Sequence, residues 1–252
     1  MIPVGSLEYA QARMQARIGR RPGEAVWTAI EHAREAEALI DLARDTSLQA
    51  PLAQLGSRRS IHAVEAVLRA YWRGVVAEVA LWMPQAWRPA LQWCGVLPEL
   101  PWLRHWAEGR RPADWMRAEP RYRELLDADR RSIPSGHEFA PLAAALAQPA
   151  LLAQAWGDEW LRRLPPAARQ AVARQAVTRL IGDYMSRSVV VAGPDGLRLR
   201  RVFDARLLAS FRRHAIEPMA AFAYLGLMAL DLDRLRGELV LRLALPARSF
   251  AS

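Results

Sequence analysis

The chain has 252 residues, of which 52% are hydrophobic and 24% charged, and this composition excludes a peptide, a linker, a collagen-like fibre and a wholly disordered chain. The single cysteine, Cys94, excludes an internal disulfide framework and Cys-rich zinc modules, and it favours a reducing compartment. The formal net charge is +9 and comes from Arg with no Lys, a usage typical of GC-rich bacterial genomes, although Arg attracts anionic partners whatever its codon origin.

Targeting and membrane-spanning patterns are not found. The segment Met1–Gly5 does not combine a basic start with an apolar stretch, so no signal peptide is expected. The longest uncharged apolar run is Met219–Leu230, which is shorter than the roughly 20 residues that cross a bilayer. We therefore expect a cytoplasmic protein that meets a membrane only peripherally.

Helical periodicity dominates the first half of the chain. Apolar residues at steps of three and four predict one amphipathic helix from Pro22 to Arg44 and a second from Ser60 to Met83. Five prolines then predict a series of short helices, among which most of the tryptophans are expected to fill a core. These tryptophans are Trp82, Trp87, Trp93, Trp102, Trp106 and Trp115.

The second half starts at a break in composition, Arg131–Gly136, which predicts a boundary between an N-terminal lobe at 1–130 and a C-terminal lobe at 131–252. Helices are expected at 139–163, 166–187, 204–213 and 218–243. Between them, β-branched residues, the Gly193–Gly196 turn signal and an alternating stretch predict a short β-hairpin at 188–202. The fold class is therefore all-α, with stacked helical bundles and one hairpin.

Residue patterns that carry chemistry are sparse. His32 with Glu35, and His62 with Glu65, are each three residues apart on expected helices, which leaves a di-metal helical enzyme as one alternative. Cys94 lies in an apolar setting that raises a thiol pKa, and no phosphate-binding glycine loop or serine-nucleophile motif occurs. We expect no cofactor, no metal and no catalytic residue.

The arginines raise a second alternative, a nucleic-acid-binding protein. Arg198, Arg200 and Arg201 fall on the expected hairpin, and a winged helix would place such a hairpin on flanking phosphates. The preceding helix offers few side chains that read bases, so a solvated basic face explains the same residues.

Both ends of the chain resemble a known family. The closing segment contains Ile216-Glu217-Pro218-Met219, then Ala223-Tyr224-Leu225, and then the stretch Leu230–Gly237. The opening segment contains Tyr9–Arg17, and the stretch Ile61–Arg111 contains Leu100-Pro101-Trp102-Leu103-Arg104 near its end. Together these segments resemble the C/d family of V-type and A-type ATPase subunits.

The resemblance implies a non-catalytic coupling role. Members of that family look like a funnel of stacked helical bundles that sits on the cytoplasmic face of the membrane rotor ring and receives the central shaft. The implied partners are therefore the ring and shaft subunits, with peripheral contact to the membrane surface and no small-molecule substrate. Partner contacts are expected at Arg13, Arg17, Trp102, Arg104, Arg234 and Arg236.

Overall fold

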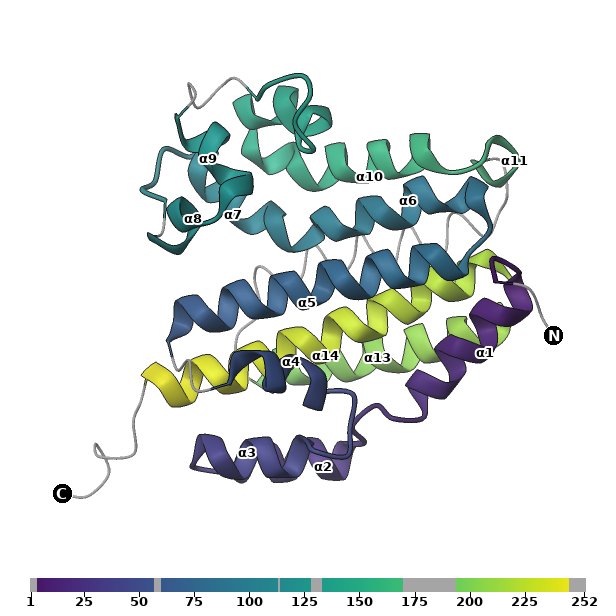
Figure 1. Cartoon of the computed structure of the whole chain (residues 1–252), viewed down its shortest axis with the longest axis vertical. Coiled ribbons are helices and arrows are strands. Elements are labelled where there is room, and N and C mark those ends of the chain that lie inside the picture. Colours follow the sequence, from purple (N-terminus) through teal and green to yellow (C-terminus); the bar gives the residue numbers. More distant parts are fainter. Residues whose placement is uncertain (1–3, 57–59, 113, 128–132, 170–193, 245–252) are drawn as a thin grey trace. The chain divides into compact units, whose positions relative to one another are not determined.

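The computed structural model describes residues 4–56, 60–112, 114–127, 133–169 and 194–244 (Figure 1). Every regular element in these ranges is an α-helix or a short 3-10 helix, so the all-α prediction is confirmed. The chain divides into two compact units: unit 1 comprises Met1–Met83 and Asp204–Ser252, and unit 2 comprises Pro84–Phe203. The boundary expected at 130/131 falls within unit 2, next to residues outside the described ranges.

Unit 1 is built from segments at the two ends of the chain. Its helices are α1 (Leu7–Ile18), α2 (Glu24–His32), α3 (Ala36–Ala43), α4 (Gln49–Leu55), α5 (Ile61–Trp82), the second half of α13 (Pro194–Arg213) and α14 (Pro218–Ala244). The two long helices α5 and α14 agree with the predictions at 60–83 and 218–243. The Ser60 hydroxyl starts α5 by accepting a hydrogen bond from the Ala63 amide, and Pro84 follows its end.

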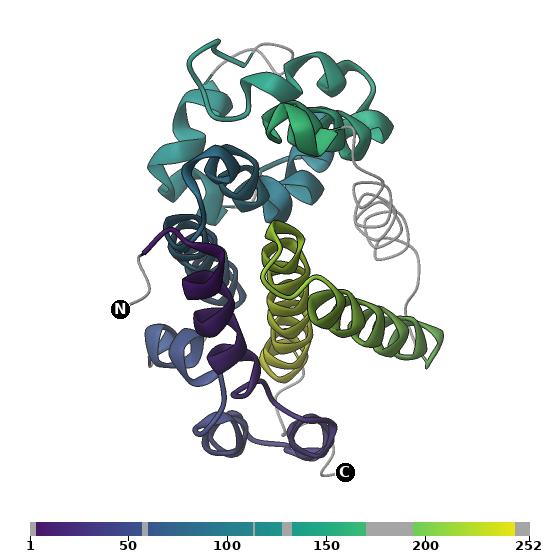
Figure 2. The ribbon, with the colours of Figure 1, turned by 90° about the vertical axis from the view of Figure 1, so that its right-hand side faces the viewer.

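The centre of unit 1 is a three-helix bundle of α1, α5 and α14, which run side by side in Figures 1 and 2. Helix α5 packs along α14, where Val64 and Leu68 belong to the same apolar cluster as Leu235 and Leu239. All four side chains are buried, and each contributes about 1.5–3 kcal/mol when fully removed from water. The bundle therefore joins the first helix of the chain to the last.

The expected single helix at 22–44 is wrong, because the chain forms two helices, α2 and α3, with a break at 33–35. The guanidinium of Arg242, in the last turn of α14, donates hydrogen bonds to the carbonyl oxygens of Ile30 and Ala33. A cation at a helix C-terminus satisfies the last carbonyls and interacts favourably with the helix dipole. The break is thus stabilised by a residue about two hundred positions away in the sequence.

Unit 2 consists of short helices interrupted by prolines. They are η1 (Gln85–Trp87), α6 (Arg88–Trp93), η2 (Cys94–Glu99), α7 (Leu100–Ala107), α8 (Asp114–Ala118), α9 (Pro120–Asp127), η3 (Ala140–Ala147), η4 (Pro149–Leu151), α10 (Leu152–Arg163) and α11 (Pro166–Arg169). The expected helix at 139–163 is wrong in its first half, where Pro141 and Pro149 mark two 3-10 helices. The helix expected at 166–187 begins as α11, and its remainder lies outside the described residues.

Tryptophans form much of the interior of unit 2. Trp93, Trp102 and Trp106 are at most 4% exposed, as is Trp82 in unit 1, which confirms that most of the clustered tryptophans are core residues. The Trp93 indole donates to the Trp156 carbonyl at 3.0 Å, and the Trp156 indole donates back to the Trp93 carbonyl at 3.3 Å. These reciprocal bonds satisfy both buried N–H groups while joining α6 to α10.

The expected hairpin at 188–202 is not present in the described residues. Its turn and second strand, residues 194–202, form the first part of α13, whereas 188–193 lie outside the described ranges. Pro194 occupies the first helical position, where its missing N–H has no intrahelical partner to lose. The helix expected at 204–213 is therefore the second half of a longer one.

Candidate functional site

A largely buried polar cluster in unit 1, which we call the terminal clasp, consists of Arg21, Asp204 and Asp231. Arg21 donates from Nε and Nη2 to the two carboxylate oxygens of Asp231, at 2.7 and 2.9 Å, and from Nη2 to Asp204 at 2.5 Å. Nearby, the Ile216 amide donates to the Gln11 side chain at 3.3 Å. The clasp thus joins the loop after α1 to α13 and α14.

Two of the three side chains of the clasp are almost completely buried. The Arg21 and Asp231 side chains are 11% and 6% exposed, whereas Asp204 is 38% exposed. Burial alone would lower the pKa of the Arg21 guanidinium, but the hydrogen bonds and charges of Asp231 and Asp204 outweigh it and raise that pKa. Bidentate geometry fixes both partners in orientation as well as in distance.

Two of the expected contact residues, Arg13 and Arg17, project from α1 toward the end of α5. Arg17 pairs with Glu78 at 2.7 Å, and both guanidinium groups lie over the Trp82 ring, at 5.3 Å for Arg13 and 4.9 Å for Arg17. Arg13 is 51% exposed and reaches Glu78 only at 3.8 Å. Arg13 therefore keeps an accessible charge, while Arg17 mainly joins α1 to α5.

Arg234, which lies on α14, binds α2. It donates to Glu31 at 2.6 Å and to Glu24 at 3.2 Å, and its guanidinium lies 4.6 Å from the centroid of the Trp27 ring. Only 10% of this side chain is exposed. Arg234 therefore supports the fold of unit 1 from the inside of the α2–α14 contact.

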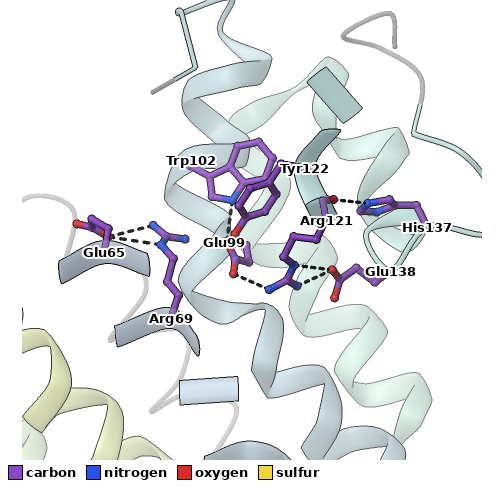
Figure 3. A network of polar contacts seen from close by, with 8 residues as sticks. All are labelled: Glu65, Arg69, Glu99, Trp102, Arg121, Tyr122, His137 and Glu138. Atoms are coloured by element: carbon purple, nitrogen blue, oxygen red, sulfur yellow. Dashed lines mark hydrogen bonds and ion pairs between the residues drawn. The ribbon is translucent and has the colours of Figure 1, made fainter. Parts of the chain in front are cut away.

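Arg236, two residues further along α14, binds α5. Its Nε donates to Glu65 at 2.5 Å, and Glu65 also accepts from Arg69 at 3.4 Å, a pair that Figure 3 draws. Half of the Arg236 side chain remains exposed. This residue combines an internal ion pair with an accessible surface.

Trp102, the expected contact residue in unit 2, belongs to a buried cluster around Glu99 (Figure 3). Glu99 is fully buried, and one of its oxygens accepts from the Trp102 indole at 2.7 Å and from the Tyr122 hydroxyl at 2.5 Å. Its other oxygen accepts from Arg121 at 3.2 Å. Trp102 is only 4% exposed, so in this structure it is a core residue.

Arg121 extends the Glu99 cluster to the surface. It pairs with Glu138 at 2.5 Å and lies 5.4 Å from the centroid of the Phe139 ring. The His137 Nδ1 accepts from the Phe139 amide, so its Nε2 carries the proton that bonds the Arg121 carbonyl at 3.0 Å. Burial opposes the charge of Arg121, but the nearby carboxylates raise the pKa of its guanidinium.

Arg104 is the expected contact residue in unit 2 with the most accessible charge. It is 47% exposed and pairs with Glu108 at 3.0 Å, one helical turn further along the chain. Exposed pairs of this kind contribute at most about 0.5 kcal/mol to stability, so Arg104 is available for other roles. Taken together, the six expected residues are distributed over both units, with Arg13, Arg104 and Arg236 the most accessible.

The residues of the di-metal alternative are not brought together. His32 is on α2 and Glu35 precedes α3, so the pair does not share one helix as expected. Glu65 is engaged by Arg69 and Arg236, as described above. Within the described residues, no three or more His, Cys, Asp and Glu side chains are grouped as metal ligands.

Cys94 is buried among the unit 2 helices, with its thiol 3.6 Å from the Ala90 carbonyl. Burial raises the pKa of the thiol to about 12. The apolar sequence around Cys94 predicts this upward shift.

The sequence patterns do not reveal which charged residues pair with one another in the fold. Asp231 belongs to the closing segment of the resemblance, but no sequence motif marks Arg21 or Asp204, and the separation of the three residues along the chain does not indicate that they pair. Glu99 and Arg121 were missed as well. The only local signal was a lone Glu in the apolar Trp-rich stretch, where a carboxylate must find buried donors.

No helix among the described ranges is long and apolar enough to cross a membrane. Comparison of the chain with protein-family models, curated proteins and solved structures returned no match. The resemblance of the two ends to the C/d family of ATPase subunits therefore stays a prediction.

Proposed function

We propose that this protein is a non-catalytic subunit of a rotary V-type or A-type ATPase, located peripherally on the cytoplasmic side, that couples the central shaft to the membrane rotor ring. The observation that carries the proposal is the bundle of α1, α5 and α14. It brings together the two terminal segments on which the resemblance rests, and residues within those segments contact one another, as Gln11 and Ile216 do.

The internal contacts of unit 1 support a role in transmitting force between partners. A protein that couples two partners transmits force between them, so it has to resist shear between its helices. Arg21, Arg234 and Arg242 each join segments about two hundred residues apart, and their side chains are 9–11% exposed. The bidentate Arg21–Asp231 pair in particular holds one geometry, because displacement leaves a buried charge without its partner.

Ile216 is a further contact candidate on the same bundle. It is 51% exposed and has a φ of 63°, in the left-handed region that a β-branched residue rarely adopts. The Gln11 side chain holds its amide in this conformation. An exposed apolar side chain in a strained, supported backbone is typical of functional surfaces, and strain of this kind costs on the order of 1–3 kcal/mol.

The test is assembly from purified components. The protein is mixed with rotor rings in nanodiscs and with the central-shaft subunits of a V-type or A-type ATPase encoded in the same genome, and complexes are separated by size. We expect a complex that contains ring, shaft and this protein. Failure of the wild-type chain to bind either the ring or the shaft would overturn the proposal.

A paired variant tests the surface itself. Changing Arg13→Glu and Ile216→Asp is expected to weaken assembly by at least tenfold, because both side chains are accessible on the bundle. The matched control is Arg44→Glu with Leu241→Asp, which alters side chains of similar exposure elsewhere on unit 1. Equal weakening by both pairs would place the contact elsewhere.

The two alternatives receive less support. The nucleic-acid alternative relied on a winged hairpin, and its turn and second strand are helical. The di-metal alternative relied on paired His and Glu side chains, and these are separated or engaged by arginines. We therefore argue neither of them as a second function.

A further inference from the structure

Helix α13 has two faces of opposite character. Its inward positions Phe203, Leu207 and Phe211 recur every four residues, and the two phenylalanines are 3% exposed. Leu207 lies against Gly226 of α14, where an added Cβ would approach the leucine methyl groups to 3.0 Å. The glycine thus lets α13 lie close to α14, and this contact fixes which side of α13 faces away from the bundle.

The outward face combines arginines with small apolar residues. In the second half of the helix it contains Ala205, Arg206, Ala209, Arg212 and Arg213, and all five are exposed. At about 100° per residue these positions fall within one arc, with the alanines between Arg212 on one side and Arg206 and Arg213 on the other. The same arc continues toward the start of the helix with the exposed residues Arg198, Arg201 and Val202.

Three charges in the second half of this face are not neutralised by carboxylates of the described residues. Arg206, Arg212 and Arg213 form no ion pair with a carboxylate of the described residues, unlike most arginines of the bundle. No Asp or Glu occurs between Ala205 and Ile216. The one carboxylate in the second half of α13, Asp204, is held by Arg21 in the terminal clasp.

We propose that the outward face of α13 binds the anionic headgroups of a phospholipid membrane, with the helix lying flat on the surface. Arginines at the two edges reach phosphate groups while their aliphatic stems and the central Ala and Val side chains lie at the headgroup boundary. This membrane binding goes beyond the coupling role, because the arginines of this face would bind a lipid surface in the absence of any ATPase subunit.

The composition of the face favours lipid over nucleic acid. A phosphate backbone would be matched by the arginines, but nucleic-acid surfaces also use side chains that donate to sugars and bases, mainly Asn, Gln, Ser and Thr. None of these occurs at the exposed positions of α13, whose middle is apolar instead. An apolar centre between cationic edges suits a surface with charged headgroups over a hydrocarbon interior.

The test is vesicle co-sedimentation of the full chain in the absence of other proteins. We expect binding to vesicles of equal parts phosphatidylglycerol and phosphatidylcholine, weakening as salt is raised, and little binding to phosphatidylcholine alone. The combined variant Arg206→Gln, Arg212→Gln and Arg213→Gln is expected to lower the partition coefficient by about 100-fold. Circular dichroism and thermal melting check that each variant is folded.

A matched control separates this face from general charge attraction. Arg44→Gln, Arg110→Gln and Arg162→Gln remove the same charge from side chains that are 64–67% exposed elsewhere. We expect this control to bind nearly as well as the wild type. A loss equal to that of the α13 variant would overturn the proposal.

A further substitution separates lipid from nucleic acid. Ala209→Leu enlarges the apolar centre without changing charge, so it is expected to raise vesicle binding several-fold and to leave binding to a random DNA duplex unchanged. Tight duplex binding that depends on the three arginines, with no response of vesicles to Ala209→Leu, would overturn the proposal in favour of nucleic acid. Absence of binding to anionic vesicles at low salt would also overturn it, and would leave the coupling role untouched.

Discussion

The two units each bury a carboxylate, but they stabilise it in different ways. In unit 1, Asp231 is held by a guanidinium, Arg21, that is itself buried and comes from the opposite end of the chain. In unit 2, Glu99 is held mainly by the neutral donors of Trp102 and Tyr122, within about 25 residues of it in the sequence. The first arrangement joins distant segments, whereas the second organises neighbouring short helices.

The two units are therefore sensitive to different substitutions. In unit 1, removal of either Arg21 or Asp231 leaves the other charge buried without its counter-charge. It also removes a contact between the two ends of the chain. Loss of the carboxylate in unit 2 leaves neutral donors unsatisfied, together with an arginine that already has a second partner in Glu138.

Arg21→Met is expected to lower the free energy of unfolding by about 3–5 kcal/mol, because it leaves Asp231 buried without its counter-charge. Urea unfolding followed by circular dichroism measures the change. The double variant Arg21→Met with Asp231→Leu should recover most of the loss, since it removes both charges. A double variant no more stable than the single one would show that the clasp contributes through more than charge pairing.

Unit 2 can be perturbed without mutation, by raising the pH. The Cys94 thiol has its pKa raised by burial to about 12, above the value near 9 of an exposed thiol. The stability gained from the neutral thiol is therefore complete below about pH 9 and is lost as the pH rises toward 12. At about pH 10.5 the loss amounts to about 2 kcal/mol.

The control for the alkaline loss is Cys94→Ala, which has no thiol to ionise. We expect its stability to decline less steeply than that of the wild type over the same pH range, in urea unfolding experiments. Native Cys94 should also react slowly with iodoacetamide near neutral pH. Parallel pH profiles for the two proteins would contradict the assignment to Cys94.

Glu99→Gln keeps the shape of the buried side chain and one acceptor oxygen but removes its charge. We expect a loss of about 1–2 kcal/mol in the free energy of unfolding, because the Trp102 and Tyr122 donors to Glu99 are neutral. Asp231→Asn should cost more, since the only partner of Asp231 in the clasp is charged. Equal losses for the two amide variants would remove the distinction between the units.

The sequence predicted the elements whose signals are local. Helices α5 and α14 have apolar residues at steps of three and four over their whole length and begin or end at Ser or Pro, so their bounds were predicted within two residues. The break between α2 and α3 has no such signal, because Ala33, Arg34 and Glu35 all suit a helix. It depends on Arg242, which no local pattern connects to this segment.

The prediction of a hairpin at 188–202 was wrong for a different reason. The Gly-Pro-Asp-Gly signal favours a turn, but Pro and Asp also suit the first turn of a helix, and the four-residue spacing of Phe203, Leu207 and Phe211 favours a helix further on. The longer periodic signal prevailed. Of the six expected contact residues, the sequence could give residue type and helix position but not burial, which is why Trp102 proved to be a core residue.

The smallest expected effect concerns Tyr224, the buried hydroxyl of unit 1. Its oxygen lies beside the Arg17 guanidinium without a well-aligned hydrogen bond in the described residues, and burial raises its pKa to about 12 although the charge and weak hydrogen bonding of Arg17 lower it. Tyr224→Phe removes an unsatisfied polar group without creating a large cavity, so it should raise the free energy of unfolding by up to about 1 kcal/mol. A loss of more than about 1 kcal/mol would show that the hydroxyl is bonded in solution, and that unit 1, like unit 2, relies on neutral donors in its core.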